Sequence, residues 1–388
     1  MKNITRLCSA TVVKASRAFP AVVLTGSRRV GKTTLLQALF PKADYRLLED
    51  PAVLAVIKSD PVGFLDSLKL PVILDEIQNA PELLGYIRAL IDRNPRKHGQ
   101  WLLTGSQEFS LMQGVSESMA GRAAILQLMP FSIAESPKVS LLHGGFPEVV
   151  LRPRSATLWF QSYLQTYIER DVRHIAQIRD LSTFRRFISL LASRNGQILN
   201  KTDIAAPLGL SIPAISKWID ILEITGQIIV VPPYYENFGK RLVKSPKIYF
   251  SDSGLVCHML GIQTLQQLVH SPFHGPIFEG FVAAEIVKQQ INSGHRRELY
   301  YFRDQRGLEI DFAVPLGQKN LTLIEAKASS TVYPSAAKHL QSLVENIRNH
   351  KTACFVVHAG NKLAESGSAL APGVKSVNLH ALLQALSR

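Results

Sequence analysis

The segment at residues 26–33 constrains the fold more than any other part of the chain. Gly26, Gly31, Lys32 and Thr33 stand at the spacing of the phosphate-binding pattern G-x-x-x-x-G-K-[ST]. The two glycines let the backbone wrap closely around a phosphate chain and turn its N–H groups inward. Lys32 is placed to reach the terminal phosphates, and the Thr33 hydroxyl is placed to bind Mg²⁺. The pattern therefore predicts a site for a nucleoside triphosphate and its magnesium ion.

The residues on both sides of this segment favour the same interpretation. An apolar, β-branched run at 21–25 predicts a strand, and the run 34–40, which ends at Pro41, predicts a helix. A strand, a glycine loop and a helix together aim a helix N-terminus at an anion. The alternative, a glycine- and lysine-rich surface turn, does not require these flanks. We expect the nucleotide to contact the following residues: Gly26, Ser27, Arg28, Arg29, Val30, Gly31, Lys32, Thr33 and Thr34.

The composition indicates a folded chain of more than one domain. With 388 residues, the chain is too long for one ordinary core, so two or three domains are expected. A hydrophobic share of 46% and a charged share of 19% are typical of globular proteins. The longest apolar runs are short and bounded by Pro or Gly, which predicts that no segment crosses a membrane. The formal net charge of +14 favours polyanionic partners, although a generally basic protein would show the same value.

The cysteines and the N-terminal residues indicate a cytoplasmic protein. Cys8, Cys257 and Cys354 are far apart and odd in number, so they fit neither a metal site nor a disulfide framework. This pattern predicts a reducing compartment. Residues 1–20 lack the apolar stretch of a secretion signal, and we expect a basic amphipathic helix there rather than a cleaved transit peptide.

An acidic motif follows the glycine loop. Residues 71–74 are apolar and predict a buried strand of a parallel sheet. Asp75 then emerges at the carboxyl end of this strand, where the ligands of open α/β sheets bind. We predict that Asp75 joins Thr33 in the Mg²⁺ shell and that Glu76 polarises the attacking water.

A further strand is predicted at 101–104, directly before Gly105 and Ser106. The hydroxyls of Thr104 and Ser106 are candidates for sensing the γ-phosphate or the attacking water. A plain turn at the end of the strand is the alternative.

Five motifs together resemble the AAA+ ATPases of bacteria and archaea that carry an uncharacterised C-terminal domain. In chain order they are GSRRVGKTT, VILDEIQ, WLLTGSQ, AGRAAILQLMPFS and GGFPE, and the resemblance runs nearly end to end. It implies a P-loop core of the ASCE type, with Glu76 as the catalytic glutamate and Ser106 at the sensor-one position. It also implies an arginine finger, for which Arg122 and Arg170 are the candidates. Arg170 with Asp171 is alternatively a structural ion pair on a helix.

The middle of the chain predicts a winged helix. A helical pattern from Phe184 leads to a short helix, a turn containing Gly209 and a second helix over 212–225. The strands 228–231 and 248–250 enclose a basic hairpin and complete the motif. This hairpin suits phosphates better than bases, so DNA contact and a purely structural or protein-docking role both stay open. Its basic residues are Lys240, Arg241, Lys244 and Lys247.

The last third of the chain predicts a restriction-endonuclease-like α/β domain. A helix at 276–287 precedes a strand hairpin that carries Asp311 and a further strand that carries Glu325 and Lys327. Because side chains on a strand repeat every two residues, Glu325 and Lys327 share a face. Two carboxylates that hold a metal ion and a lysine near the phosphate are the groups that metal-assisted phosphodiester hydrolysis needs.

This order of elements resembles the PD-(D/E)xK nuclease superfamily. The resemblance makes Asp311, Glu325 and Lys327 candidates for catalytic residues. It also implies that Asp311 and Glu325 bind a metal ion together with an acid from the preceding helix, either Glu279 or Glu285. We predict Glu285 as this third metal ligand. The alternative is that Glu325 and Lys327 form an ordinary pair on a solvated face. Domains of this type also bind without cutting.

The sequence thus predicts an α/β protein with three domains. They are a P-loop AAA+ parallel-sheet core (1–150), a helical linker and winged helix (151–255), and a PD-(D/E)xK nuclease-like domain (256–388). The leading hypothesis is a Mg²⁺-dependent ATPase that acts as a switch or motor on nucleic acid, with DNA favoured, and that also carries a metal-dependent nuclease. The alternative is a regulatory ATPase whose other domains only bind DNA or protein. AAA+ resemblance further implies a homo-oligomer in which subunits complete each other's sites.

Overall fold

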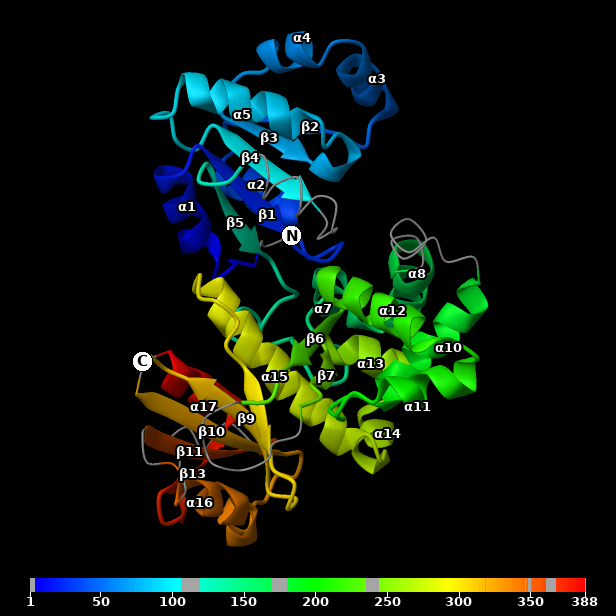
Figure 1. Cartoon of the computed structure of the whole chain (residues 1–388), viewed down its shortest axis with the longest axis vertical. Helices are drawn as coiled ribbons and strands as arrows, with labels where there is room; N and C mark the ends of the chain where they lie inside the picture. Colours follow the sequence, from blue (N-terminus) through cyan, green and yellow to red (C-terminus); the bar gives the residue numbers. More distant parts are fainter. Residues whose placement is uncertain are drawn as a thin grey trace. The chain divides into compact units, whose positions relative to one another are not determined.

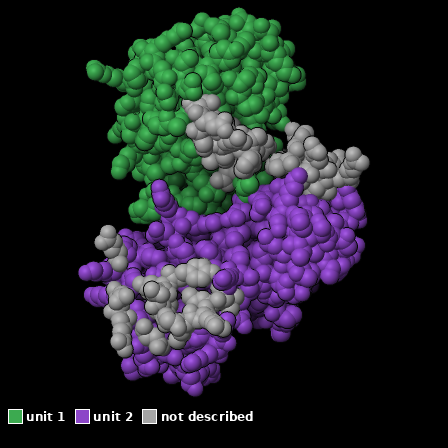
Figure 2. Space-filling view, in the orientation of Figure 1, with its two compact units in different colours: residues 1–131, 224–226, 291–295 green, residues 132–223, 227–290, 296–388 purple. Residues whose placement is uncertain are grey.

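The computed structural model describes residues 4–105, 119–168, 180–234, 244–317, 319–345, 347, 350–360 and 368–387. The chain forms two compact units, which Figure 2 distinguishes by colour. Unit 1 contains residues 1–131, 224–226 and 291–295, and unit 2 contains residues 132–223, 227–290 and 296–388. Figure 1 labels the helices and strands.

Unit 1 is built on a five-stranded parallel sheet with the strand order β2-β3-β4-β1-β5. Strands β1, β3 and β4 are buried along their whole length, as expected for apolar runs in a sheet covered on both faces. The predicted parallel-sheet α/β core is therefore confirmed. The strands are β1 (Ala21–Thr25), β2 (Asp44–Leu47), β3 (Val72–Asp75), β4 (Trp101–Gly105) and β5 (Ala123–Gln127).

Helices cover both faces of this sheet. Residues Leu84 and Ile87 of α5 join Val23 and Leu103 in one apolar cluster on the first face. Helix α1 contacts β1, and α2 contacts β3 and β4. Strand side chains alternate between faces, so the remaining buried residues of β1, such as Val22, face the other way. The helices of this unit are α1 (Ser9–Ala18), α2 (Lys32–Leu39), α3 (Pro51–Ser59), α4 (Pro61–Asp66), the 3₁₀ turn η1 (Ile77–Asn79) and α5 (Leu83–Arg93).

The first part of unit 2 is helical and ends in a strand pair. Phe184 and Phe187 of α10 pack edge-to-face against Trp218 of α12, which forms a small aromatic core. Strands β6 and β7 follow these helices in the sequence and pair with each other in antiparallel orientation. The elements are α7 (Pro147–Leu151), η2 (Pro153–Ser155), α8 (Ala156–Tyr163), the π-helical turn η3 (Leu164–Ile168), α10 (Leu181–Ser193), α11 (Lys201–Ala205), η4 (Ala206–Leu208), α12 (Ile212–Ile224), β6 (Ile228–Val231) and β7 (Lys247–Phe250).

The second part of unit 2 contains a six-stranded mixed sheet with the order β12-β13-β11-β10-β9-β8. Strands β10, β11 and β13 are parallel, whereas β8, β9 and β12 run antiparallel to their neighbours. Leu340 and Leu343 of α16 pack into the apolar cluster of this sheet. The elements are α13 (Ser253–Met259), α14 (Leu265–His270), α15 (His274–Asn292), β8 (Tyr300–Arg303), β9 (Glu309–Pro315), β10 (Asn320–Lys327), η5 (Pro334–Ala337), α16 (Lys338–Val344), β11 (Lys351–His358), β12 (Ser368–Ala371), β13 (Val374–Asn378) and α17 (Leu379–Leu386).

Residues 132–150, which the three-domain prediction assigns to the N-terminal domain, belong to unit 2. Backbone N–H groups explain this placement: that of Ile133 donates to Glu285 at 2.9 Å, and that of Gly145 donates to Asp252 at 2.7 Å. The division into three domains stays a prediction. Among the described residues, no single helix is long and apolar enough to cross a membrane, and one bent pair (201–208 with 212–224) passes by length and composition only.

Candidate functional site

The glycine loop, residues 26–33, takes a backbone path that requires glycine at two positions. Gly26 has φ 146°, and a Cβ there would lie 2.1 Å from the carbonyl oxygen of Leu128. Gly31 has φ 93° and is the residue directly before α2. Both values lie in a region that L side chains rarely adopt. The loop therefore connects the end of β1 to the N-terminus of α2, the place where helices bind anions.

Lys32 is buried, although it carries a charge. Its Nζ donates to the carbonyl oxygens of Gly26 at 3.0 Å and Ser27 at 3.1 Å. These bonds satisfy the ammonium group, which burial would otherwise destabilise. The lysine is thus held against the loop itself, at the start of α2.

Asp75 is the centre of a group of hydroxyl donors. Thr33 Oγ1 lies 2.8 Å from one of its carboxylate oxygens and 2.9 Å from the other. Tyr45 of β2 donates from its hydroxyl at 2.8 Å, and Thr104 of β4 donates as well. Because β3 lies between β2 and β4 in the parallel sheet, the carboxyl ends of all three strands meet here. The structure therefore brings together Thr33 and Asp75, the two predicted magnesium ligands of this site.

Glu76 sits beside Asp75 in an unusual backbone conformation. Its φ of 61° is left-handed, which is uncommon for a residue other than glycine. Its backbone N–H donates to the Thr104 hydroxyl at 3.1 Å, and its carboxylate accepts from the Gln78 side chain. Backbone strain of this kind costs about 1–3 kcal/mol and clusters at functional sites.

The donor set at Asp75 fits Mg²⁺. A hydroxyl and a carboxylate are hard oxygen ligands, and Mg²⁺ is usually held by one or two carboxylates together with substrate phosphates. Within the described ranges, no three or more His, Cys, Asp or Glu side chains are arranged so that they could hold a metal ion by themselves.

Arg6 supports the glycine loop and was missed in the sequence analysis. It is buried, with one guanidinium nitrogen 2.9 Å from the carbonyl oxygen of Val30 and another 2.6 Å from that of Met129. Its guanidinium also lies over the ring of Phe131, 4.6 Å from the centroid. Arg6 therefore ties the loop to the segment that follows β5. The one signal in the sequence is that Arg6 is a basic residue located before the first helix, α1, which begins at Ser9.

The structure places Arg122 away from the glycine loop. Arg122 directly precedes β5, and its carbonyl accepts from the N–H of Ala21, the first residue of β1. The loop follows the other end of β1, so Arg122 and the glycine loop of the same chain lie at opposite ends of this strand. Its guanidinium makes two bonds to Asp92, at 2.6 and 3.0 Å. A role toward a second copy stays a prediction. Two further candidates, Ser106 and Arg170, lie outside the described residues.

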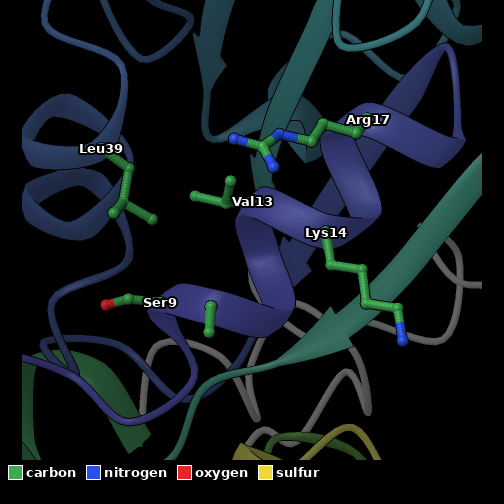
Figure 3. Close-up of a pocket in the computed structure, with 6 residues that line it drawn as sticks. Ser9, Val13, Lys14, Arg17 and Leu39 are labelled. Atoms are coloured by element: carbon green, nitrogen blue, oxygen red, sulfur yellow. The ribbon is translucent and has the colours of Figure 1, made fainter.

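A pocket of about 420 Å³ opens between α1 and α2. Figure 3 shows Val13 and Leu39 on facing sides of it, with Arg17 above them. Leu39 ends α2, whereas Lys32 begins it, so this pocket lies at the opposite end of the helix from the glycine loop. It is not the candidate nucleotide site.

Four acidic side chains of the C-terminal part form an acidic cluster: Glu279 of α15, Glu309 and Asp311 of β9, and Glu325 of β10. One oxygen of Asp311 accepts from the N–H of Ala326 at 2.9 Å, which ties β9 to β10 at this point. Lys327 Nζ lies 2.7 Å from Glu325. Burial raises the pKa of Glu279 to about 7, and the Asp311 charge adds to the increase. Burial, with Asp311 second, likewise raises the pKa of Glu325 to about 7.

Glu285, the predicted metal ligand on α15, does not belong to this cluster. It is fully buried, and Lys288 Nζ lies 2.8 Å from one of its oxygens. Its other oxygen accepts from the N–H of Ile133 at 2.9 Å. Both oxygens are therefore engaged by groups other than Asp311 and Glu325, and the structure does not bring Glu285 together with the other predicted ligands. Glu279, the other helix acid, is the one that shares the electrostatic environment of Asp311.

Lys247 of β7 belongs to the predicted basic hairpin, for which phosphate contact and a structural role were both open, and its burial fits the structural role. Its side chain is only 3% exposed and lies among three acids: Glu309 at 2.7 Å, Glu279 at 3.0 Å and Asp311 at 3.7 Å. Burial opposes its charge, but these carboxylates outweigh burial and raise its pKa. Lys240 and Arg241 lie outside the described residues.

Three family models match successive parts of the chain. Residues 18–136 match a model described as an AAA domain. This part of the chain resembles an AAA-type ATPase domain. The match supports the predicted P-loop and ATP-binding character of the N-terminal domain. Residues 135–266 and 274–380 match models described as domains of unknown function, DUF8612 and DUF4143, which assign no activity.

Curated relatives extend over most of the chain. The chain is 29% identical to the uncharacterized protein Rv2008c of Mycobacterium tuberculosis over 362 residues, which cover 92% of this chain and 80% of the relative. The uncharacterized protein Mb2031c of Mycobacterium bovis gives the same values. An uncharacterized protein of Haemophilus influenzae is 23% identical and covers 81% of this chain and 82% of its own length.

Two solved structures are more distant. The Walker-type ATPase PABY2304 of Pyrococcus abyssi is 16% identical with a TM-score of 0.41, over 65% of this chain and 94% of that chain. The RuvB Holliday junction branch migration motor of Thermotoga maritima is 15% identical with a TM-score of 0.32, over 58% of this chain and 89% of that chain. Both TM-scores are too low for any conclusion about this chain.

Proposed function

We propose that the N-terminal domain binds and hydrolyses ATP with Mg²⁺ and that hydrolysis controls how the rest of the chain engages nucleic acid, with DNA favoured. The observation that carries the ATPase part is the meeting of Thr33 with Asp75 at 2.8 Å, beside Lys32 and Glu76. These residues come from the glycine loop, the following helix and the end of β3, which are the elements that the phosphate-binding pattern requires.

The chain's own residues divide the work. Backbone N–H groups of residues 26–33 hold the phosphates, and Lys32 leaves its loop carbonyls to neutralise the terminal phosphate oxygens. Glu76 orients the attacking water and accepts its proton. Thr33 and Asp75 would hold Mg²⁺, which when bound neutralises the charge that develops on the transferred phosphoryl group. Tyr45 and Thr104 keep the Asp75 carboxylate in place through their hydroxyl groups.

Two observations support nucleic acid as the partner. The formal net charge of +14 favours a polyanion. The order α10, α11, α12, β6 and β7 is compatible with the winged helix that the sequence predicts, and helix-turn-helix folds of this kind bind DNA. We further propose a cytoplasmic homo-oligomer in which Arg122 or Arg170 of one copy serves the nucleotide of the next.

ATP hydrolysis by the full chain, measured alone and with single-stranded DNA, duplex DNA or RNA, tests this proposal. We expect stimulation by DNA, and we expect Lys32→Ala to abolish both the basal and the stimulated rate. Unchanged turnover in Lys32→Ala contradicts the ATPase assignment. Turnover that no nucleic acid alters, together with no binding at low salt, favours the regulatory ATPase that docks protein, because phosphate contacts should be strongest at low salt.

A second function, metal-dependent nucleic-acid cleavage, is favoured by the acidic cluster. Asp311, Glu325 and Lys327 lie together at neighbouring strands, as phosphodiester hydrolysis requires. Asp311 and Glu325 would hold Mg²⁺ together with phosphate oxygens of the nucleic acid, and bound metal would activate water. Nicking of plasmid DNA with Mg²⁺ or Mn²⁺ should disappear in Asp311→Ala and Glu325→Ala but persist in Glu298→Ala, an exposed control. Binding without nicking favours the alternative of a domain that only binds DNA.

A further inference from the structure

Lys247 connects two parts of unit 2 that are distant in the sequence. It is the first residue of β7, whereas the acids around it belong to α15 and β9. Its Nζ lies within 3.0 Å of Glu279 and 2.7 Å of Glu309. Glu309 is also held by Arg303, at 3.1 Å, on its other oxygen. A buried ammonium group therefore lies among three of the four acids of the acidic cluster.

The hairpin that carries Lys247 is attached to the edge of the C-terminal sheet. Tyr234, on the N-terminal side of the hairpin, donates from its N–H to the carbonyl of Tyr301 at 2.7 Å, and the N–H of Tyr301 donates to the carbonyl of Pro232 at 3.1 Å. On the other side, the Tyr301 hydroxyl donates to the carbonyl of Ser245. Residues on both sides of the hairpin are thus fixed to β8, which determines where Lys247 lies.

Tyr249 adds a second connection between β7 and the acidic cluster. Its hydroxyl donates to Glu279 at 2.5 Å, on the same oxygen that Lys247 contacts. Side chains two residues apart on a strand point to the same face, so β7 presents both groups to α15 together. Two residues of β7 therefore hold the Glu279 carboxylate in position.

The acidic cluster retains an unused ligand atom. Within the described part of the chain, the Oε2 atom of Glu325 is buried and has no hydrogen-bond partner, whereas its Oε1 is paired with Lys327. Glu325 is only 7% exposed. Leaving a buried carboxylate oxygen unpaired is unfavourable, and a cation at this oxygen would remove the cost.

We infer that Lys247 is the built-in cation of the acidic cluster and that a divalent metal ion binds there only in competition with it. The choice of a divalent ion rests on the second proposed function, metal-dependent cleavage of nucleic acid. A metal ion beside Asp311 and Glu325 meets the positive charge of Lys247 across Asp311, 3.7 Å from Nζ. The positive charge of Lys247 therefore lowers the affinity of the cluster for a divalent ion.

Manganese binding by the full chain tests the inference. Free Mn²⁺ is measured by electron paramagnetic resonance during titration, without nucleotide and without DNA. We expect Lys247→Met to bind Mn²⁺ about tenfold more tightly than the wild type or better, because a like charge a few ångströms away changes an ionic equilibrium by one or more powers of ten. Lys247→Arg keeps the charge and should keep the wild-type affinity. Adding Asp311→Asn to Lys247→Met should remove the gain.

Lys288→Met is the matched control. Lys288 is also a buried lysine that pairs with a glutamate of α15, but its partner is Glu285, outside the acidic cluster. It should not raise Mn²⁺ affinity. Equal or weaker Mn²⁺ binding in folded Lys247→Met, or an equal gain in Lys288→Met, overturns the inference.

A charge-balanced comparison keeps the test decisive if Lys247→Met alone does not fold. Glu279→Gln is then compared with the double variant Glu279→Gln/Lys247→Met, in which one charge of each sign is removed. The double variant should again bind Mn²⁺ about tenfold more tightly than the single one, and equal affinities contradict the inference. Because Mn²⁺ binding is read without ATP or DNA, the result does not depend on whether the chain hydrolyses ATP or cleaves nucleic acid.

Discussion

Thr33 Oγ1 lies 2.8 Å from the Asp75 carboxylate, which joins the glycine loop to the end of a strand that is far away in the sequence. This contact depends on the strand order, because β4 lies between β1 and β3 and carries Thr104 to the same carboxylate. The hydroxyl groups of Thr33, Thr104 and Tyr45 therefore all contact the same buried carboxylate. The glycine loop and the strands β2, β3 and β4 therefore meet at this carboxylate.

Lys32→Ala should reduce ATP hydrolysis by about 100-fold or more, because it removes a positive donor aimed at the developing phosphate charge. Phosphate release and the binding of a fluorescent ATP analogue measure the two effects separately. Lys42→Ala removes an exposed lysine that lies beyond the end of α2 and should leave both unchanged. Comparable losses in both variants would show that the effect is not specific to the loop.

Glu76→Gln should keep ATP binding but reduce turnover by about 10²–10⁴-fold, the usual contribution of a general base. The amide has nearly the same shape as the carboxylate but cannot accept the proton. Single-turnover hydrolysis and the dissociation constant of ATP check both parts. Glu82→Gln, at an exposed position close to the start of α5, serves as the control. Normal turnover in Glu76→Gln would assign the base elsewhere.

The sequence predicts the N-terminal site well because its signals are local. The glycines, Lys32 and Thr33 are fixed by one short pattern, and a buried parallel strand must end near the same edge of the sheet as its neighbours. The pair Glu325 and Lys327 follows from strand periodicity in the same way. These expectations need no knowledge of which distant residues will be in contact.

The residues that the sequence did not reveal act through distant contacts. Arg6 bonds to Met129, separated from it by 123 positions, and no periodicity relates the two. The choice between Glu279 and Glu285 depends on which face of α15 meets the sheet, and two residues six apart on a helix face different ways. Lys247 belongs to a basic hairpin, and only its attachment to β8 turns it inward.

Arg6→Ala should destabilise the glycine loop. Two charge-assisted hydrogen bonds from a buried guanidinium are lost, and two carbonyls are left without them, at a cost of about 2–4 kcal/mol. We expect a lower melting temperature and weaker ATP binding, with saturating ATP restoring part of the stability. Arg17→Ala, an exposed arginine of α1, should change neither property. A stable Arg6→Ala variant with wild-type ATP affinity would contradict a role for Arg6 in positioning the loop.

Asp252 should make stability depend on pH. It is buried at the start of α13 and accepts from the N–H groups of Gly145 and Leu255. Burial raises its pKa, and the charge of Lys288 only partly offsets this. The folded chain therefore holds this proton at pH values where the unfolded chain, with an aspartate pKa of about 3.9, has lost it. The folded state then binds more protons, so the free energy of unfolding falls as pH rises through this range.

Asp252→Asn removes this ionisation and isolates its contribution. The melting temperature of the wild type minus that of Asp252→Asn should be largest below the ordinary aspartate pKa of about 3.9 and should decrease as the pH is raised through and above it. Differential scanning calorimetry over a pH series measures both proteins under the same conditions. A difference that increases with pH would mean that the N–H donors and Lys288 outweigh burial, so that the Asp252 carboxylate is stabilised in its charged form.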